Sequence, residues 1–255
     1  PAVQVAMGRV ICSSLLLLLI SLFCKDKLTL NCKKDYGLMI MTGLVMAIHW
    51  SSFFQSIQTS SVAIGTITFS TFPLFLTFLE PLLFHEKIRG KNILNALILL
   101  LGVLITIPEF SVENKVTVGI LWGMLASFTY AVMTLSNRYF SSRYKGRTIC
   151  LYEQGTAAIA LLPALVLVKA AWRPVDFAGV ATIGFLCTAI AYSLYVTAQK
   201  GVKAQTAGII SGMETVYGIV FALLFLREVP TIRELVGGAV ILGIAFYSSL
   251  HSDDD

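Results

Sequence analysis

Five side chains that can carry charge lie within long apolar stretches of this chain. They are one arginine, one histidine and three glutamates: Arg9, His49, Glu80, Glu153 and Glu214. A charge at the centre of a lipid bilayer costs about 3 kcal/mol even on scales derived from membrane insertion, so each residue needs a specific reason to be there. The chemistry open to them is the binding of a polar or charged solute, or the uptake and release of a proton.

Polar and small residues recur at helical spacing along four of the apolar stretches. The course i, i+4, i+7 puts them on one face of each predicted helix, and polar faces in a membrane point inward. Helix packing is the structural alternative for any one stripe, whereas four stripes together favour a polar cavity. The stripes are Thr66, Ser70, Pro73, Thr77 and Glu80; Gly123, Ser127, Tyr130, Thr134 and Asn137; Thr188, Tyr192, Tyr195 and Gln199; and Ala207, Ser211, Glu214 and Gly218.

Aromatic residues accompany these stripes. Such a lining would suit an amphipathic or apolar compound better than a phosphate ester, which would need several basic residues at depth. Within the predicted spans, Arg9 is the basic residue at depth. The aromatic residues are Trp50, Phe53, Phe72, Tyr130, Tyr192 and Tyr217.

The composition predicts a chain that crosses a membrane several times. Of the 255 residues, 56% are hydrophobic and 13% are charged, and the mean hydropathy is +0.81. A soluble domain of this length needs a polar shell that such a composition cannot supply. The net charge of +5 therefore gives no reason to expect a nucleic-acid partner, because in a membrane protein the location of the basic residues matters more than their sum. The five cysteines have no metal-binding spacing, and no metal or cofactor is expected.

Nine apolar segments are each long enough to cross roughly 30 Å of hydrocarbon, which takes about 20 helical residues. The predicted fold is an all-α membrane protein with short connections. The predicted spans are residues 3–23, 37–56, 61–84, 92–108, 117–137, 149–169, 176–198, 204–226 and 233–250.

The distribution of basic residues predicts the orientation. Thirteen of the 19 lysines and arginines lie in the alternate loops 24–36, 85–91, 138–148 and 199–203, against five on the other side. Positively charged loops remain in the cytoplasm. We therefore expect a multi-pass protein of the cytoplasmic membrane, with the tail from His251 inside and Pro1 outside.

Two landmarks reveal an internal repeat. Ala47-Ile48-His49-Trp50 precedes Glu86 by 39 residues, and Ala189-Ile190-Ala191-Tyr192 precedes Glu228 by the same distance. The matched spans run in opposite directions, which is the usual build of a secondary transporter. The predicted halves are residues 1–110, with four helices, and 111–255, with five. Symmetry then implies a tenth helix before Pro1, which is missing from the sequence.

Several motifs resemble the EamA-type members of the drug/metabolite transporter superfamily. They are Ser61-Val62-Ala63-Ile64-Gly65 through Phe72-Pro73, then Leu79-Glu80-Pro81 and His85-Glu86-Lys87, the counterpart that ends in Arg227-Glu228, and Arg9 in the opening span. The resemblance covers nearly the whole chain. It implies ten helices in two halves around a central cavity, and transport of small metabolites, often amino acids. Without the first helix, one wall of that cavity would be open.

Depth assigns roles to the candidate residues. At 1.5 Å per residue, Glu214 lies roughly 16 Å from the predicted loop, near the midplane. The expected substrate-binding residues are Glu214, His49, Trp50, Arg9, Tyr130, Tyr192, Ser211 and Tyr217, and the expected gating or proton-coupling residues are Glu153 and Glu80.

Each of these roles has a structural alternative. Glu214 could be a neutral, hydrogen-bonded acid, Trp50 an anchor of its helix, and Arg9 one half of an ion pair. Glu80 could satisfy a carbonyl that Pro81 frees. Glu86 and Glu228 are expected to order their loops through nearby lysines and arginines.

The leading hypothesis is a secondary transporter that exports amino-acid-like or amphipathic compounds by alternating access. Its partners would be the small-molecule substrate, the lipid bilayer and a coupling proton, with a substrate gradient as the other driving force. The chain has no P-loop motif with which to use ATP. In a proton mechanism Glu214, with His49 or Glu153, would alternate between protonated and ionised states. The sequence leaves the substrate and the oligomeric state open.

Two other hypotheses remain. An intramembrane enzyme would need a zinc motif or a Ser/His pair at depth, and three histidines in a span, a loop and the tail cannot supply it. The other is a non-transporting, N-terminally truncated fragment, which the expected tenth helix suggests.

Overall fold

The computed structural model describes residues 1–84, 90–198 and 204–250, and within these ranges it leaves out the side chains of Phe84, residues 204–212 and Ser249. Every regular element in the described ranges is helical, and none is a strand, which confirms the prediction of an all-α chain. The landmark Glu86, the side chain of Ser211 and the tail from His251 lie outside the described residues.

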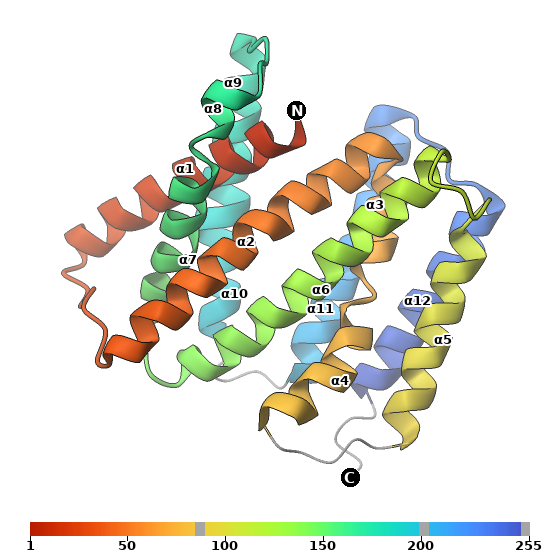
Figure 1. The fold of residues 1–255 in the computed structure, drawn as a ribbon, viewed down its shortest axis with the longest axis horizontal. Helices are drawn as coiled ribbons and strands as arrows, with labels where there is room; N and C mark the ends of the chain where they lie inside the picture. Colours follow the sequence, from red (N-terminus) through yellow and green to blue (C-terminus); the bar gives the residue numbers. More distant parts are fainter. Residues whose placement is uncertain (85–89, 199–203, 251–255) are drawn as a thin grey trace. The chain divides into compact units, whose positions relative to one another are not determined.

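Nine helical segments correspond to the nine predicted spans (Figure 1) within the described ranges. Several segments are interrupted and carry more than one label. They are α1 Ala2–Phe23; α2 Lys33–Thr59; α3 Val62–Phe69 with α4 Phe72–Phe84; α5 Gly90–Thr106; α6 Lys115–Ser141; α7 Gly146–Leu161 with α8 Ala164–Leu167; α9 Pro174–Thr182 with the π-helix η1 Ile183–Tyr192 and α10 Ser193–Ala198; α11 Ala204–Phe221 with the π-helix η2 Ala222–Leu226; and α12 Ile232–Leu250.

Six of these segments are long and apolar enough to cross a membrane: Ala2–Phe23, Lys33–Thr59, Val62–Leu83, Lys115–Ser141, Gly146–Leu167 and Pro174–Ala198. Leucines that would meet solvent in a soluble protein, such as Leu19 and Leu22 of α1, are exposed. For a chain in lipid this exposure is favourable, since hydrocarbon is the surrounding solvent. By length and composition these six segments are candidates to span a membrane, and spanning by α5, α11 with η2, and α12 stays a prediction from the sequence.

The chain forms two compact units that alternate along the sequence. Unit 1 comprises Pro1–Ser51 and Val132–Gly201, and unit 2 comprises Ser52–Ala131 and Val202–Asp255. The long helices α2 and α6 each begin in one unit and end in the other. Each unit therefore takes residues from both predicted repeat halves, and the halves themselves, 1–110 and 111–255, stay a prediction.

In unit 1, α1 packs against α7, η1 and α9. Close approach needs small residues: a Cβ on Gly43 of α2 would lie 2.9 Å from the Glu153 carbonyl oxygen of α7. Met39 of α2, Leu17 of α1 and Ile149 of α7 are buried in one apolar cluster of this unit. Unit 1 is thus a tightly packed bundle whose helices touch through glycines and aliphatic side chains.

Charged loops tie unit 1 together at one end. The Asp26 side chain, 1% exposed, accepts hydrogen bonds from Lys145 Nζ at 2.8 Å and from Arg147 Nε at 2.9 Å. The bond from Lys145, followed by that from Arg147, lowers the pKa of Asp26 although burial acts against it. Nearby, the Tyr144 hydroxyl donates to Asp35 Oδ2 at 2.6 Å, and burial together with this bond raises the pKa of Tyr144.

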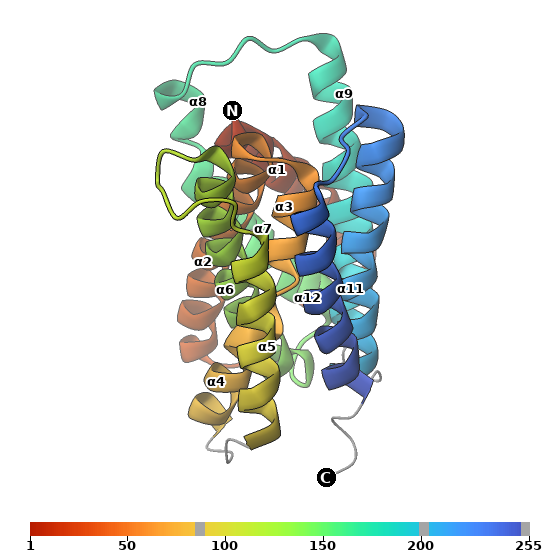
Figure 2. The same cartoon turned by 90° about the vertical axis from the view of Figure 1, so that its right-hand side faces the viewer.

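In unit 2, α5 and α12 lie side by side (Figure 2). A Cβ on Gly102 of α5 would lie 2.6 Å from Ile241 Cγ1 of α12, so a larger residue would push the helices apart. Helix α3 packs against α11, where Thr215 Oγ1 donates to the Thr66 carbonyl at 3.0 Å and also pairs with the Ser70 hydroxyl. Hydroxyl bonds of this kind join helices where water is absent.

Glu228 orders the start of α3. Its Oε2 accepts a hydrogen bond from the Val62 N–H at 3.0 Å, while the Ser61 side chain accepts one from the Ile64 N–H. A carboxylate at a helix N-terminus satisfies an orphan donor and complements the helix dipole. The partner that the structure shows for Glu228 is therefore a backbone N–H, where the sequence analysis expected lysine or arginine.

The Asp26 network predicts a pH-dependent loss of stability. Asp26→Asn should lower the free energy of unfolding at pH 7 by roughly 1 kcal/mol, because the two cations remain partly in water. The pKa of Asp26 is depressed from its ordinary 3.8, so its contribution is complete above that value and is lost as the pH falls through the folded-state pKa. Thermal unfolding of both proteins from pH 7 to pH 3 checks this.

Glu113→Gln is the control, since Glu113 is an exposed carboxylate in the loop before α6. It should leave stability unchanged at both pH values. A difference between Asp26→Asn and the wild type that stays constant down to pH 3 would contradict the assigned role of the Asp26 carboxylate.

Candidate functional site

Unit 1 brings three of the predicted site residues together around a buried cation. Arg9 of α1 is 8% exposed, and its Nε donates to Thr188 Oγ1 of η1 at 2.5 Å. Its guanidinium carbon lies 3.3 Å from the centre of the Trp50 ring, and His49 packs edge-on against Trp50 with ring centroids 4.7 Å apart. Stacking on an aromatic face is a way to hold a guanidinium that has left water.

The π-helix η1 creates the contact with Arg9. Thr188 Oγ1, which accepts from Arg9, also donates to the Ile183 carbonyl five residues earlier at 2.9 Å. At Gly184, a Cβ would lie 2.5 Å from the Cys12 side chain and 2.9 Å from the Arg9 carbonyl oxygen. Only glycine lets η1 approach α1 closely enough for Thr188 to reach Arg9. π-Helical turns occur frequently at functional sites.

A second polar cluster in unit 1 centres on Glu153 of α7, whose side chain is fully buried. Asn137 Nδ2 of α6 donates to the Tyr192 hydroxyl at 2.9 Å, and that hydroxyl donates to Glu153 Oε2 at 3.3 Å. Glu153 Oε1 and Asn137 Oδ1 have no hydrogen-bond partner among the described residues. Buried polar atoms without partners are rare and need an explanation.

The two clusters share one element and one apolar neighbour. Thr188 and Tyr192 lie four residues apart on η1. Trp50 and Tyr192 both pack against a single apolar cluster, formed by Val10, Met46, Ala47, Met133, Ala157 and Ala158. The Arg9 cluster and the Glu153 cluster therefore belong to the same region of unit 1.

The other predicted site residues belong to unit 2. Tyr130 packs edge-on against Phe69 and Phe72, with ring centroids 4.8 and 5.1 Å away. Glu214 and Tyr217 lie on an exposed face of α11, whereas buried Thr215 makes the contact with α3. The remaining predicted residues are Glu80, partly exposed on α4, and Ser211, whose side chain lies outside the described residues.

Three contact residues were missing from the predicted site: Thr188, Asn137 and Thr215. The first two belong to the polar stripes found in the sequence, so helical periodicity was the available signal. Thr215 lies next to Glu214 and carries no stripe signal of its own. For a metal ion, no group of three or more His, Cys, Asp or Glu residues comes together among the described residues.

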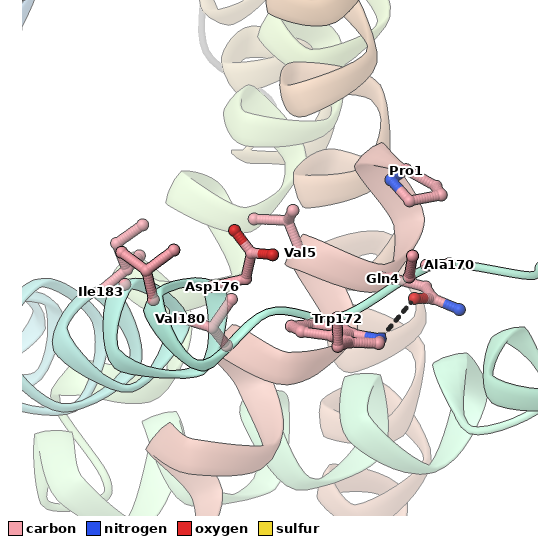
Figure 3. Close-up of a pocket in the computed structure, with 11 residues that line it drawn as sticks. Pro1, Gln4, Val5, Ala170, Trp172, Asp176, Val180 and Ile183 are labelled. Carbon is pink, nitrogen blue, oxygen red and sulfur yellow. Dashed lines mark hydrogen bonds between the residues drawn. The ribbon is translucent and has the colours of Figure 1, made fainter.

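A pocket of about 380 Å³ opens in unit 1 between the start of α1 and the start of α9 (Figure 3). Polar side chains of the pocket join the start of α1 to later segments. Trp172 Nε1 donates to Gln4 Oε1 at 2.9 Å, and Gln4 donates to the Ala164 carbonyl of α8. Asp176 pairs with Arg173 at 3.0 Å. None of the predicted site residues lines this pocket.

The close approach at Gly184 predicts the effect of one added methyl group. Gly184→Ala should destabilise the protein by roughly 1–3 kcal/mol, because the new Cβ meets the α1 backbone and must push η1 away from Arg9. Gly179→Ala is the matched control in the same segment, since nothing lies within 4 Å of its Cβ position. It should be neutral or stabilise by up to about 1 kcal/mol through helix propensity. Thermal unfolding in detergent measures both, and equal effects would contradict the assigned contact.

Comparison with known proteins identifies the family. Relatives described as uncharacterized transporters occur in Archaeoglobus fulgidus, at 24% identity over 83% of this chain and 77% of that protein, and in Helicobacter pylori strain J99, at 27% identity over 92% and 80%. A crystal structure of a protein without a stated function superposes with a TM-score of 0.69 at 16% identity, covering 98% of this chain and 87% of that one, which supports the fold.

The model of the EamA-like transporter family matches residues 1–107 and 117–250, which is nearly the whole chain. This confirms the resemblance found in the sequence motifs. The family is one of membrane transporters and not of enzymes, so a small-molecule substrate and a multi-pass arrangement in the membrane follow. The chain therefore belongs to the EamA-like transporter family.

Proposed function

We propose that this transporter carries amino-acid-like or other amphipathic compounds that bear a carboxylate, and that it exports them by alternating access. The observation that carries the proposal is the buried Arg9 cluster in unit 1. A guanidinium binds a carboxylate through two parallel hydrogen bonds, and these bonds are stronger in a site without water. The aromatic ring of Trp50 offers an apolar surface to the rest of the same solute.

The neighbours of Arg9 fix the orientation of its guanidinium group. The hydrogen bond to Thr188 fixes Nε, and stacking on Trp50 fixes the plane of the group. A cation whose orientation is fixed before binding loses little conformational entropy when the solute arrives. His49, packed against Trp50 and 1% exposed, supports the ring.

Among the described lysine and arginine side chains Arg9 is the buried one, and one arginine favours a carboxylate over a phosphate ester. A phosphate ester carries up to two negative charges and would need several basic groups at depth. Tyr192 of unit 1 is a further candidate for contact with the solute. The roles expected from the sequence for Glu214, Ser211, Tyr217 and Tyr130 in solute binding, and for Glu80 in gating, stay predictions.

The direction of insertion follows the distribution of positive charge. The end of unit 1 that carries Arg143, Lys145 and Arg147 would face the cytoplasm. In this orientation Pro1 and the pocket near Trp172 face outward, and the C-terminal tail is cytoplasmic. The host membrane would be the cytoplasmic membrane of the cell.

A ligand screen with paired probes tests the carboxylate. We expect leucine or a related amino acid to raise the unfolding temperature of the purified protein, and the matched amino alcohol, which lacks the carboxylate, to have no effect. Arg9→Lys should weaken binding by about 10- to 100-fold, because lysine cannot form the bidentate pair. Arg173→Lys is the control, since Arg173 is exposed and pairs with Asp176.

Transport is then measured in proteoliposomes, as exchange of internal for external labelled leucine. Exchange in the wild type that Arg9→Lys abolishes and Arg173→Lys retains would support the proposal. If the amino acid and the amino alcohol bind equally well, Arg9 does not recognise a carboxylate. If no compound stabilises the protein or exchanges, the non-transporting alternative takes precedence.

A further inference from the structure

The surroundings of Glu153 are unusual for a carboxylate. The side chain is fully buried in α7, its Oε2 accepts one hydrogen bond from Tyr192, and its Oε1 has no partner among the described residues. No ion-pair partner of Glu153 is found in that part of the chain. A buried negative charge without a cation is costly, whereas a neutral carboxylic acid is tolerated, so the charge state of this group must respond to its access to water.

The elements packed around α7 supply no cation bonded to Glu153. Apart from Glu153 itself, the buried and half-buried titratable side chains that α1, α2, α6, α7, η1 and α10 contribute to unit 1 are Arg9, Cys12, Asp35, Tyr36, His49, Tyr139, Arg147, Cys150, Tyr152, Tyr192 and Tyr195. Among these, Tyr192 is bonded to Glu153, while Arg9 is held by Thr188 and Trp50. Lys145 and Arg147 are paired with Asp26.

The hydrogen bonds have a fixed direction. Asn137 Nδ2 can only donate, so the Tyr192 oxygen accepts from it and the Tyr192 proton points to Glu153 Oε2. Tyr192 therefore holds the carboxyl group in place whether or not that group carries a proton. This leaves Oε1 as the atom at which a proton can be gained or lost.

The three residues lie near one end of unit 1. At 1.5 Å per residue, Glu153 is about 10 Å from the start of α7, Tyr192 about 9 Å from the end of α10, and Asn137 about 6 Å from the end of α6. The loop that carries Lys145 joins the end of α6 to the start of α7, and Lys145 pairs with Asp26. The end of α10 lies beside the start of α7, since a Cβ on Gly146 would lie 3.0 Å from the Thr197 backbone nitrogen. The route from water to Glu153 is thus shortest from the basic end.

We propose that Glu153 is the proton-binding site of this transporter, with Tyr192 and Asn137 as its positioning residues. On release, the O–H bond at Oε1 breaks, the proton passes to water at the basic end, and the remaining carboxylate keeps the hydrogen bond from Tyr192. Uptake reverses these steps. Coupling to a solute rests on the proposed function, whereas proton binding does not.

The π-helix η1 provides a physical connection between proton and solute. It carries both Thr188, which contacts Arg9, and Tyr192, which contacts Glu153. A displacement of η1 on solute binding would move Tyr192 and change the strength of its hydrogen bond to Glu153, and with it the proton affinity of Glu153. By linkage, the charge of Glu153 then biases the position of η1 to the same extent.

Infrared spectroscopy during a pH titration tests proton binding without any knowledge of the solute. The carbonyl stretch of a protonated carboxyl group should be present in the wild type, disappear as the pH rises, and be missing in Glu153→Gln. Glu113→Gln, which removes an exposed carboxylate, should keep the band. In Tyr192→Phe the pH of half-disappearance should rise by about one unit, because the carboxylate loses a donor.

Two infrared results would overturn the proposal. One is a spectrum unchanged by Glu153→Gln, which would mean that Glu153 is always ionised. The other is a band assigned to Glu153 that persists at every pH at which the protein stays folded, which would make the residue a fixed structural acid.

Transport in proteoliposomes tests coupling with labelled leucine as the probe. Glu153→Gln should still exchange leucine, at a reduced rate, but should no longer accumulate it in response to a pH gradient. Accumulation equal to that of the wild type would exclude Glu153 as the coupling site. If the wild type transports neither leucine nor any other amino acid, the proposed function fails while the infrared titration still decides the proton site.

Discussion

The close contact between η1 and α1 at Gly184 is the interaction on which the organisation of unit 1 depends. Without it, Thr188 could not reach Arg9, and the arginine would lose one of the contacts that hold it in place. A buried charge in a membrane protein is stable only where several groups compensate for lost water. Here an aromatic face, a hydroxyl and the tight packing of two helices provide that compensation together.

Unit 2 uses polar groups for a different purpose. Thr215 and Ser70 join α11 to α3 through their hydroxyl groups, and the Glu228 carboxylate accepts a hydrogen bond from the Val62 N–H at the start of α3. The hydroxyl bonds hold neighbouring helices together, and the carboxylate bond caps a helix. Unit 1, by contrast, buries the cation Arg9 and the carboxyl group of Glu153, and their neighbours Trp50 and Tyr192 pack against one apolar cluster. The proposed solute-binding residue, Arg9, and the proposed proton-binding residue, Glu153, therefore both belong to unit 1.

The arrangement of the two polar clusters suggests how a small protein could combine two tasks. π-Helical turns are rare within α-helices and are frequent at functional sites. Because η1 contacts both clusters, a displacement of η1 would move Thr188 and Tyr192 together. The basic residues Lys145 and Arg147 lie at the end of unit 1 nearest Glu153, and under the proposed orientation that end faces the cytoplasm.

The sequence by itself determined the helices and the family. The apolar runs had to be helical because lipid offers no partners for backbone N–H and C=O groups, and their ends fell at the basic loops and prolines. The predicted segments agree with the observed helices to within a few residues, and the motifs around Ser61 and Glu80 indicated the EamA-type family that the comparison confirmed. Residue type, depth and helical periodicity together with the internal repeat also selected Arg9, Trp50, Tyr192 and Glu153 as candidate site residues.

Only the tertiary structure decided which of these residues meet. Periodicity at 3.6 residues per turn could not reveal that residues 183–192 wind as a π-helix, which rotates Thr188 toward Arg9 and Tyr192 toward Glu153. Nor could it show that Glu228 caps a helix that begins 166 residues earlier in the chain. Such pairings depend on the rotation and depth of each helix against its neighbours, and packing of side chains sets both, whereas hydropathy sets only which segments enter the membrane.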